Sequence, residues 1–526
     1  MDDEGASTSS ASDSETQHHE SAAAEHGLES VKRKLCRLVA SSLSVTVPGL
    51  DVEPMLEVSK PGFGDYQCNN ALSLFSSLRG TGTNFQNPRS IGQTILNNLP
   101  SSDIVESTSV AGPGYVNIVI SSDWIAKMIQ DMLIYGIKTW APTMPVNRVI
   151  VDFSSPNIAK EMHVGHIRST IIGDALARML EFANVEVLRR NHVGDWGTQF
   201  GMLIEFLFEQ FPNWKEVGNQ AIEDLQSFYK ASKIKFDDES SGFKAKAKQA
   251  VVRLQQGEDR YRAAWEKICQ ISHNEFDSVY KRLGVELEEK AASMAGWLPD
   301  QNEKEYPKTT HVGFGLVLGL DGKRFRTRCS EVVRLVDLLD EAKSRCKEEL
   351  IGRLTENGKI ADWTVDELDT TSEAIGLGAV KYADLKNNRL TDYTFSFDKM
   401  LSDKGNTAVY LQYAHARICS IIRKANKDIE ELKTKASITF VHADERALGL
   451  HVIRFQEVVE QACADLLPHY LCDYLYSLSE AFSKFYASCQ VVGSPEEASR
   501  LLLCHATAVV MRQCFNLLGI TPVYKL

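Results

Sequence analysis

Residues 147–194 constrain the fold most, because their pattern requires two parallel strands joined by a helix. Residues 147–155 (NRVIVDFSS) are a β-branched run of strand length, and a turn containing Pro156 follows them. Apolar residues then recur at helical spacing over residues 163–184. Residues 185–194 (VEVLRRNHVG) predict a second strand. This order is a βαβ unit, so we expect a parallel sheet covered by helices.

The turn between the first strand and the helix carries the residues best suited to chemistry. It reads SSPNIAKEMHVGH over residues 154–166, with His163 and His166 on one side of the first helical turn. A ligand there would lie beyond the carboxyl end of a strand, where a helix N-terminus attracts phosphate. Gly165 leaves room for a nucleotide to approach the backbone. The two imidazoles can donate hydrogen bonds to charge that develops on a phosphoryl group in a transition state.

A bare His-x-x-His pair also has simpler interpretations, namely metal ligation or an ordinary surface pair. Metal ligation is disfavoured because no Cys, Asp or further His lies nearby at ligand spacing, apart from the distant His192. We therefore predict no metal site. The position of the pair between a strand and a helix favours a nucleotide site.

Charge is distributed unevenly along the 526 residues, a length that suits roughly three domains. The net charge is −12, but residues 1–27 contain seven acidic residues and no Lys or Arg. We expect this Ser, Ala and Glu-rich tail to be disordered. A net negative charge alone argues against a general DNA coat, since phosphate binding depends on Lys and Arg. Because most of the excess lies in the tail, a local nucleic-acid contact stays possible.

The chain has the features of a cytoplasmic protein. It has no run of ~18 apolar residues, so we expect no membrane span. The acidic tail has neither the Arg-rich character of an organelle-targeting peptide nor the apolar region of a secretory signal. The eleven cysteines are odd in number and form no Cys-x-x-Cys pair, which predicts reduced thiols.

The pattern on either side of the βαβ unit predicts two further domains. Residues 27–137 mix a helical start with loops and a strand-like run at 110–120, which suits a small α+β domain. Pro142, Pro145 and Asn147 then predict a linker. From about residue 330 to the end the pattern is helical with short loops, which predicts an all-α bundle.

The region between the βαβ unit and the bundle is mostly helical. Residues 200–289 have charged helical faces, with a polar interruption at 230–249. The lysines of this interruption are expected on a solvated surface, and a tRNA-facing role is the alternative. Residues 311–318 (HVGFGLVL) predict a short strand, and the basic run KRFRTR follows at 323–328.

The turn at 154–166 resembles the class I aminoacyl-tRNA synthetase signature, whose loose form is HIGH, and its flanking letters resemble arginyl-tRNA synthetases of the eukaryotic cytosolic type. Five further pieces resemble the same family in order along the chain. They are GDYQCNNAL (64–72), AGPGYVNI (111–118), NHVGDWGTQFG (191–201), KYADLKNNRLTDYTFSFDKML (381–401) and GNTAVYLQYAHAR (405–417). The resemblance covers nearly everything after the tail.

This resemblance implies an α/β fold with a Rossmann-like class I nucleotide-binding domain at 147–345. An N-terminal α+β domain that contacts tRNA would occupy 28–140, and an all-α anticodon-binding bundle would occupy 346–526. The implied activity is that of an arginine–tRNA ligase. It would join L-arginine to ATP, which comes with Mg²⁺, as an arginyl-adenylate, release pyrophosphate, and transfer arginine to tRNA(Arg). The family suggests a monomer.

The resemblance also implies roles for residues of the turn and of the basic run. His163 and His166 would stabilise the α-phosphoryl transition state, and Asp152 would receive the substrate's ammonium group. The family's lysine loop, KMSKS in its standard form, corresponds to Arg324-Phe325-Arg326-Thr327-Arg328, where Arg326 would be the main pyrophosphate contact. Lys160 resembles a lysine that compensates for a degenerate loop. The remaining residues implied in the arginine and adenylate pocket are Ser155, Pro156, Asn157 and Gly165.

Two groups of residues are implied to contact tRNA. In the N-terminal domain these are Tyr66 and Asn70. In the C-terminal domain, Tyr410, Tyr413 and Arg417 share a helix face. Aromatic and Arg side chains suit unstacked anticodon bases, although a packing stripe explains the tyrosines equally well. Gln412 lies beside this face and completes the set.

After Lys290 the chain departs from the family, which continues with the second half of the nucleotide-binding fold. We find no match to that half, because Ala291 begins a stretch resembling the part just before the lysine loop. We therefore expect an internal deletion of roughly 30 to 60 residues, or one to two βαβ units. It would remove one wall of the arginine pocket and leave the strand at 147–155 with an unpaired edge, unless HVGFGLVL covers it. The alternative function is a catalytically impaired form that acts at most as a tRNA-binding protein.

Overall fold

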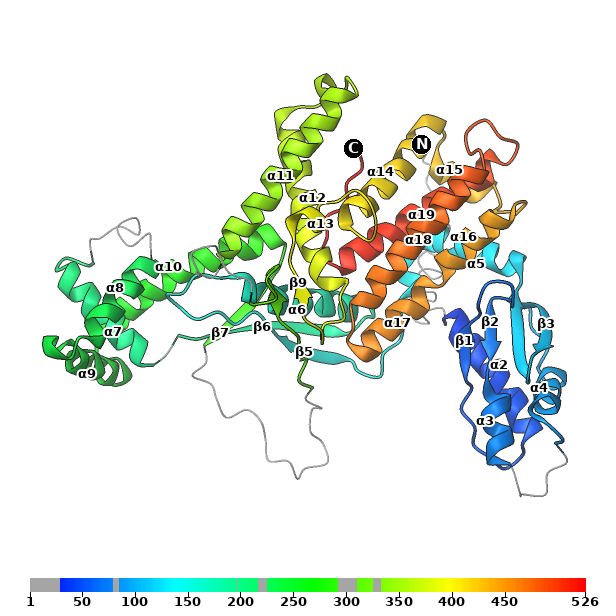
Figure 1. Cartoon of the computed structure of the whole chain (residues 1–526), viewed down its shortest axis with the longest axis horizontal. Helices are drawn as coiled ribbons and strands as arrows, with labels where there is room; N and C mark the ends of the chain where they lie inside the picture. Colours follow the sequence, from blue (N-terminus) through cyan, green and yellow to red (C-terminus); the bar gives the residue numbers. More distant parts are fainter. Residues whose placement is uncertain (1–28, 79–84, 196, 216–224, 292–309, 325–332) are drawn as a thin grey trace, which may run out of the picture.

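The computed structural model describes residues 29–78, 85–195, 197–215, 225–291, 310–324 and 333–526. The acidic tail at 1–27 lies outside these residues. The molecule is elongated, with the N-terminal domain at one end and helices α8 (Leu225–Asp237) and α9 (Phe243–Gln255) at the other (Figure 1). A parallel sheet and the C-terminal helices lie between them.

The N-terminal domain is an α+β unit built on a four-stranded antiparallel sheet of order β1-β2-β4-β3. The run at 110–120, expected as one strand, is a hairpin whose turn contains Gly112 and Gly114, both at positive φ. The helices and strands are α2 (Val31–Thr46), β1 (Leu56–Val58), β2 (Tyr66–Cys68), α3 (Asn70–Ser77), α4 (Pro88–Asn97), β3 (Val105–Ala111) and β4 (Tyr115–Ile120).

Helix α5 (Ser122–Tyr135) and the short 3-10 helix η1 (Ile137–Trp140) follow the antiparallel sheet. Residues 141–147 then have no regular structure, as the linker prediction requires.

The βαβ unit is confirmed by β5 (Arg148–Asp152), α6 (Val164–Phe182) and β6 (Glu186–Val193). Strands β5 and β6 are parallel, and β7 (Glu288–Ala291) adds to the far side of β6 in the order β5-β6-β7. Helix α6 ends at the predicted place, where Asn184 adopts a φ of 59°. Asn tolerates this left-handed conformation better than most residues.

In the described part of residues 194–287, α-helices connect β6 to β7 and extend to the end of the molecule opposite the N-terminal domain (Figure 1). They are α7 (Thr198–Gln210), α8, α9 and α10 (Asp259–Leu283). The expected polar interruption at 230–249 is wrong in extent, because helix covers most of it. The break is limited to the one-turn η3 (Glu239–Ser241) and to Gly242, which has a φ of 64°.

Strand β5 has no strand on its other side among the described residues. The segment HVGFGLVL supplies β8 (Val317–Leu318), which pairs with β9 (Tyr393–Thr394) and does not reach β5. Ile150, in the middle of β5, is 62% exposed. Parallel sheets usually have helices over both faces. Within the described part of the chain, part of β5 is therefore exposed to solvent.

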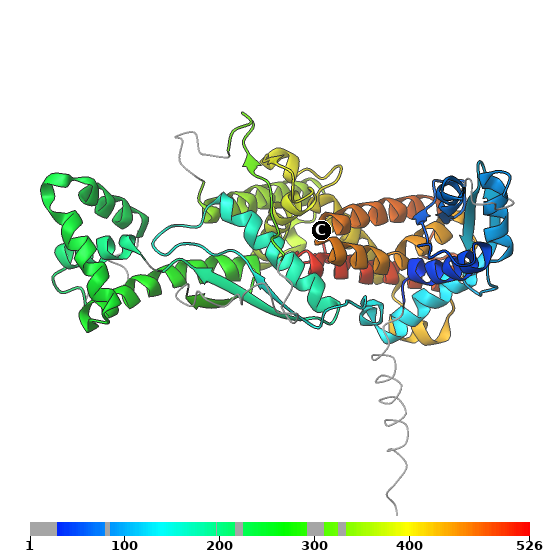
Figure 2. The ribbon, with the colours of Figure 1, turned by 90° about the horizontal axis from the view of Figure 1, so that it is seen from below.

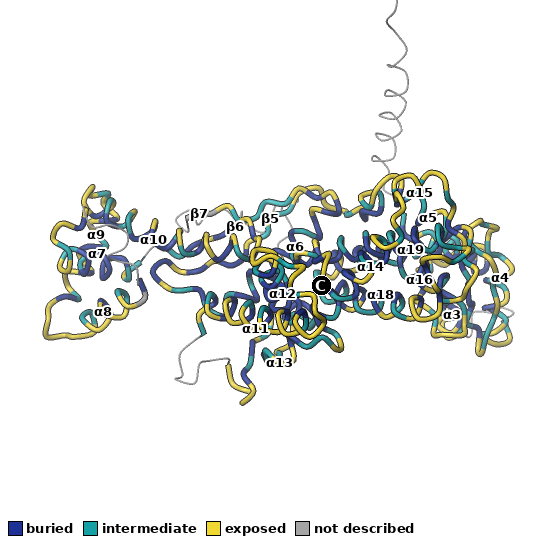
Figure 3. Tube along the Cα trace, turned by 90° about the horizontal axis from the view of Figure 1, so that it is seen from above, coloured by how far each residue is buried: buried dark blue, intermediate teal, exposed yellow. Residues whose placement is uncertain are grey.

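The C-terminal part of the chain is helical and forms the thick middle of the molecule (Figure 2). Many residues of its central helices are buried (Figure 3). The predicted boundary at 345/346 falls inside α11, so one helix continues across it. The elements are α11 (Leu335–Glu356), η5 (Ile360–Asp362), α12 (Val365–Leu385), α13 (Phe397–Met400), α14 (Ala408–Ala425), α15 (Ile429–Lys435), α16 (Ala443–Ile453), α17 (Phe455–Asp465), α18 (His469–Ser488) and α19 (Glu497–Leu517).

A buried ion pair joins α6 to this helical region. Arg168 Nε lies 3.2 Å from Asp384 Oδ2, and both side chains are 1% exposed. Arg168 also donates to the carbonyl oxygen of Thr391 at 3.0 Å. Arg168 comes only five residues after His163, so this contact ties the start of α6 to helix α12.

A second set of contacts attaches the N-terminal domain to the helical region. Arg446 of α16 forms an ion pair with Asp65 at 2.7 Å. Beside it, the Tyr66 hydroxyl donates to Glu457 Oε2 of α17 at 2.9 Å.

We predict that Arg168→Met destabilises the protein by about 3–5 kcal/mol, because it leaves the Asp384 carboxylate buried without its partner. Urea unfolding measures the loss. Adding Asp384→Leu to this variant should recover most of it, since the uncompensated charge is then removed. A cost of about 1 kcal/mol or less for the single variant, as in a surface pair, would contradict the prediction.

We also predict that Ile150→Thr changes the free energy of unfolding by no more than about 0.5 kcal/mol, since the side chain is largely in water. The matched control is Val193→Thr on β6 of the same sheet, where the side chain is fully buried. Burial of the hydroxyl should cost about 1–3 kcal/mol there. Equal losses at the two positions would show that β5 is covered.

Candidate active site

The turn between β5 and α6 contains three non-glycine residues with left-handed backbone angles. Ser154, Ser155 and Ala159 have φ values of 73°, 49° and 59°. Such angles cost on the order of 1–3 kcal/mol each and cluster at functional sites. The end of β6 holds the turn in place, since Gly194 N–H donates to Pro156 O at 3.1 Å and Gly194 O accepts from Ile158 N–H at 3.1 Å. Pro156 is buried and shapes the turn from inside.

Asn157 is exposed in this turn, and its side chain lies against Gly194. A Cβ atom on Gly194 would overlap the Asn157 amide oxygen. Glycine therefore leaves room for the Asn157 side chain where the turn crosses the end of β6. Asn157 is among the residues predicted from the sequence, whereas Gly194 is not. A glycine directly after a strand was the available signal for a close backbone approach.

His163 and His166 form a reciprocal cap at the N-terminus of α6. The Nδ1 atom of His163 accepts from Gly165 N–H at 3.0 Å, and the Nδ1 atom of His166 accepts from His163 N–H at 3.1 Å. The ring centroids are 4.0 Å apart. Because each Nδ1 accepts a hydrogen bond, each neutral ring carries its proton on Nε2. Both side chains are partly exposed, so the pair can present two N–H donors to a ligand.

The local environment keeps both rings neutral near pH 7. Burial, with help from the charge of Lys160, lowers the pKa of His163 below its ordinary value. Burial, His163 and Lys160 together lower the pKa of His166 to about 4. Lys160 is exposed, and its Nζ lies 5.7 Å from the centre of the Tyr229 ring. A cation therefore lies near two neutral donors, as an anionic ligand requires.

Gly165 also has a role that the sequence does not predict. A Cβ atom there would lie 2.8 Å from Cε1 of the His163 ring. That Gly165 admits a nucleotide to the backbone stays a prediction. The glycine makes room for the ring of His163, which folds back to cap the helix.

Asp152 lies at the carboxyl end of β5, and His192 lies near the carboxyl end of β6. His192 Nδ1 is 3.0 Å from Asp152 Oδ1, and the hydroxyl of Ser155 donates to the same oxygen at 3.2 Å. Asp152 and Ser155 are exposed. The structure thus brings the predicted residues Asp152 and Ser155 together at the edge of the sheet. It adds His192, for which the sequence suggested only a distant metal ligand.

The basic run is described only as far as Arg324, which is exposed and forms a backbone bridge with Leu318. Arg326 and Arg328 lie outside the described residues. The chain that follows the run returns to the histidine pair, since Val164 N–H donates to Val333 O at 3.1 Å and Leu335 N–H donates to Met162 O at 2.9 Å.

An ion pair of 2.9 Å between Arg334 and Glu161 reinforces this contact. The structure therefore places residues 333–335, which follow the basic run in the chain, beside the predicted catalytic residues.

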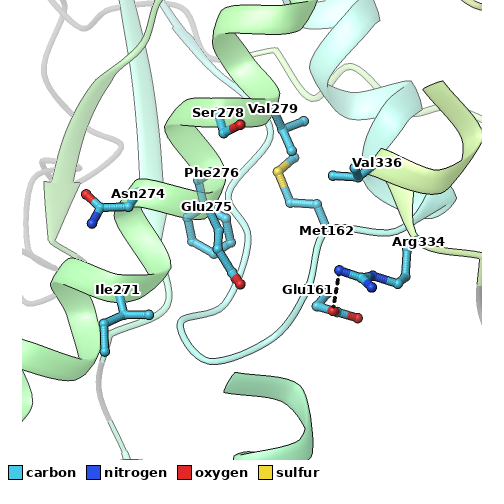
Figure 4. Close-up of a pocket in the computed structure, with 10 residues that line it drawn as sticks. All are labelled: Glu161, Met162, Ile271, Asn274, Glu275, Phe276, Ser278, Val279, Arg334 and Val336. Carbon is cyan, nitrogen blue, oxygen red and sulfur yellow. Dashed lines mark ion pairs between the residues drawn. The ribbon is translucent and has the colours of Figure 1, made fainter. Parts of the chain in front are cut away.

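A pocket of about 380 Å³ lies between α10, the start of α11 and the residues just before the histidine pair (Figure 4). The Arg334–Glu161 ion pair lies at its edge. None of the predicted site residues lines it, so it is separate from the exposed side of the turn. Its lining residues are Glu161, Met162, Ile271, Asn274, Glu275, Phe276, Ser278, Val279, Arg334 and Val336.

The two predicted tRNA contacts in the N-terminal domain are buried. Tyr66 is 0% exposed, and its hydroxyl is directed to Glu457. Asn70 accepts from Met55 N–H at 2.7 Å and donates to Glu53 O at 2.8 Å. Neither side chain presents a surface to RNA in this structure. Tyr66 instead joins two domains, and Asn70 holds a loop.

The predicted face on α14 divides into exposed and buried residues. Tyr410 and Tyr413 are partly exposed and Arg417 is exposed, so these three share an accessible face. Gln412 is 0% exposed. Its amide donates to Thr521 O at 2.8 Å and accepts from Val523 N–H at 2.8 Å. Gln412 therefore holds the C-terminal segment of the chain, which explains its place beside the tyrosines.

Three general features complete the description of the site. No group of three or more His, Cys, Asp or Glu side chains suited to a metal occurs in the described ranges. The cysteines that the structure describes form no disulfide. None of the described helices is long and apolar enough to cross a membrane.

Three family models match the chain in order. The N-terminal domain of arginyl tRNA synthetase matches residues 30–120. The catalytic domain of class I (R) tRNA synthetases matches 128–303 and 291–397. The DALR anticodon binding domain matches 411–526. The last two matches meet between residues 397 and 411, downstream of the boundary that we predicted.

Curated relatives match over nearly the whole chain. The chloroplastic/mitochondrial arginine–tRNA ligase of Arabidopsis thaliana is 56% identical over 96% of this chain and 92% of its own length. The cytoplasmic arginine–tRNA ligase of the same plant is 56% identical over 94% of this chain and 98% of its own. The human cytoplasmic arginine–tRNA ligase is 38% identical over 94% and 88%.

Two solved structures have the same fold. An arginyl-tRNA synthetase from Plasmodium falciparum has a TM-score of 0.77 and 29% identity, over 95% of this chain and all of that one. An arginyl-tRNA synthetase from Thermus thermophilus has a TM-score of 0.75 at 20% identity, over 94% of this chain and all of that one.

We predict that the imidazoles of His163 and His166 are mainly neutral at pH 7 and carry their proton on Nε2, which NMR of the ring nitrogens can measure. Lys160→Met should raise the pKa of both rings, because it removes a positive charge that opposes their protonation. Lys248→Met, which removes an exposed lysine of α9, is the control and should leave both pKa values unchanged. A proton on Nδ1, or no response to Lys160→Met, would contradict the assignment.

Proposed function

The chain belongs to the arginyl-tRNA synthetases, the class I arginine–tRNA ligases, and from this premise we propose that its histidine pair promotes the formation of arginyl-adenylate. The carboxylate of L-arginine would attack the α-phosphorus of ATP, and pyrophosphate would leave. A hydroxyl of the terminal adenosine of tRNA(Arg) would then attack the arginyl carbonyl carbon, and AMP would leave. Mg²⁺ would enter as part of the ATP substrate.

The observation that carries this proposal is the capping geometry of the two histidines. Both Nδ1 atoms accept backbone hydrogen bonds, so both neutral rings hold the proton on Nε2. Donors held in place before the reaction stabilise charge that develops on a phosphoryl group without further rearrangement. The N-terminal end of α6 adds a partial positive charge at the same place.

The other residues of the turn would bind the substrates. Asp152 would receive the ammonium group of arginine once its contact with His192 opens. Ser155 and Asn157 are exposed and would contact the adenylate, while Pro156 and Gly165 shape the turn and the cap. Lys160 would bind phosphate oxygens. The three arginines of the basic run, Arg324, Arg326 and Arg328, would bind the departing pyrophosphate.

The tRNA would contact the accessible face of α14. Tyr410, Tyr413 and Arg417 offer rings for stacking and a guanidinium for base edges or phosphate. We further propose that the chain acts as a monomer in the cytoplasm. The names of its cytoplasmic relatives support that location, although a chloroplastic/mitochondrial relative is equally similar.

A second candidate function is favoured by the size of the central sheet. Only β5, β6 and β7 pair in it within the described part of the chain, and part of β5 faces water. The catalytic family model matches in two pieces that overlap at residues 291–303. This overlap lies at the predicted deletion near Lys290 and Ala291.

The length of the alignments agrees with a deletion. The alignment with the chloroplastic/mitochondrial relative spans 595 positions, whereas 96% of 526 residues is about 505. About 90 positions therefore have no residue of this chain, more than the 30 to 60 that we expected. These observations support a form that lacks part of its arginine pocket and retains tRNA binding.

We predict that the purified chain charges tRNA(Arg) with labelled arginine in the presence of ATP. His166→Asn should lower kcat about 10²–10³-fold, since it removes a donor to the transition state. His442→Asn is the control, because His442 caps α16 as His163 caps α6: its Nδ1 accepts from the backbone N–H two residues on, that of Asp444, at 3.2 Å. It should leave kcat unchanged.

Two other results would decide against the proposal that the histidine pair promotes adenylate formation. One is tRNA(Arg) binding without charging, under conditions in which the cytoplasmic relative from Arabidopsis thaliana charges the same tRNA; this result favours the second candidate. The other is equal activity of His166→Asn and His442→Asn, which would remove the histidine pair from the mechanism.

A further inference from the structure

A line of buried polar side chains forms hydrogen bonds to the turn between β5 and α6, the turn with the left-handed backbone angles. The hydroxyl of Ser154 lies 2.9 Å from the Thr170 hydroxyl and 2.8 Å from the Tyr280 hydroxyl. Thr170 is on α6 and Tyr280 is on α10, more than a hundred residues further along the chain. All three side chains are buried. A single serine at left-handed φ therefore contacts two helices that enclose the turn.

Asn191 of β6 extends this line to the next residue of the turn. Its amide nitrogen donates to the Tyr280 hydroxyl at 3.3 Å, and its amide oxygen accepts from Ser155 N–H at 2.9 Å. At the other end, the Thr170 hydroxyl donates to the carbonyl oxygen of His166 at 2.8 Å. The line thus begins beside Ser155 and ends at one of the two histidines.

The order of protons along this line follows from the groups themselves. A carbonyl oxygen cannot donate, so the single hydroxyl proton of Thr170 goes to His166. Ser154 must then donate to Thr170, and its oxygen must accept from Tyr280. Tyr280 in turn accepts from Asn191. Each hydroxyl therefore donates once and accepts once, which gives one direction from Asn191 to His166.

We propose that Tyr280 is a positioning residue, whose hydroxyl sets the backbone of Ser154 and Ser155 relative to His166 for the proposed reaction. This inference rests on the proposed function, because it concerns the same turn. Buried hydrogen-bonded lines of this kind give a turn one geometry and oppose alternatives. Tyr280 is central because it joins the donor from β6 to the acceptor in the turn.

A phenylalanine at this position would break the line without opening a cavity. The hydroxyl of Ser154 would lose its donor, and the amide of Asn191 would lose its acceptor. Small misplacements of groups around a reacting centre lower rates about 10²-fold. We therefore expect Tyr280→Phe to lower kcat of arginine-dependent ATP–pyrophosphate exchange about 10- to 100-fold, with a smaller change in the KM for ATP.

The matched control is Tyr261→Phe on the same helix. Tyr261 is also buried, and its hydroxyl also has two partners, Glu205 at 3.1 Å and Arg253 at 3.0 Å, away from the turn. A second pair of variants tests the line at Thr170. Thr170→Ser keeps the hydroxyl and should retain activity, while Thr170→Val removes it and should behave like Tyr280→Phe.

Amide hydrogen exchange of the free protein gives a readout that does not depend on catalysis. Tyr280→Phe should accelerate exchange at Ser155, whose N–H bonds Asn191, and Tyr261→Phe should not. Equal kinetics and equal exchange in the two variants would overturn the proposal. A loss of protection spread evenly over the sheet would also overturn it, since that is a general loss of stability. If the wild-type chain shows neither pyrophosphate exchange nor charging of tRNA(Arg), the proposed function fails and hydrogen exchange alone decides the role of Tyr280.

Discussion

The buried ion pair between Arg168 and Asp384 is the constraint on which the site depends. Helix α6 begins with the histidine pair, and its second turn is fixed to α12 through charges removed from water. A buried pair tolerates little displacement, because separating the charges leaves each without compensation. The direction of the histidine rings therefore depends on the placement of the C-terminal helices. Arg168 joins the catalytic and helical regions of this chain close to the histidine pair, whose position the proposed reaction depends on.

Local pattern predicted the parts of the fold whose cause is local. The βαβ unit followed from β-branched runs at either end of an apolar helix, and Asn184 ended that helix as expected. The alternation at 115–120 correctly predicted β4, whereas the strand-like run at 110–120 also included the end of β3 and the Gly-Pro-Gly turn between the two strands. A strand pattern cannot show whether a glycine pair inside it bends the chain back on itself. The polar stretch at 230–249 misled for a similar reason, since charged helices and loops share a composition.

The sequence located the segment that forms the candidate site, but not the arrangement of side chains around it. The letters around His163 and His166 located the turn, whereas its supports come from distant positions: Gly194 and Asn191 from the next strand, and Tyr280 from α10. Their contacts depend on tertiary packing, which no spacing along the chain records. Tyr66 and Gln412 were expected to contact tRNA, but the structure places both in the interior. Both residue types suit RNA, and both are buried in contacts that hold one part of the chain against another.

The cap of α6 has a consequence for the ligand that this helix can accept. Two of the described helices begin with a histidine cap, yet α16 carries Asp444 and Glu445 in its first turn, while the first turn of α6 has no acidic residue. Carboxylates in the first turn stabilise a helix by offsetting its dipole. Helix α16 has this internal compensation. Helix α6 has no such carboxylate at its positive end. An anion that binds there from outside would therefore stabilise the helix itself.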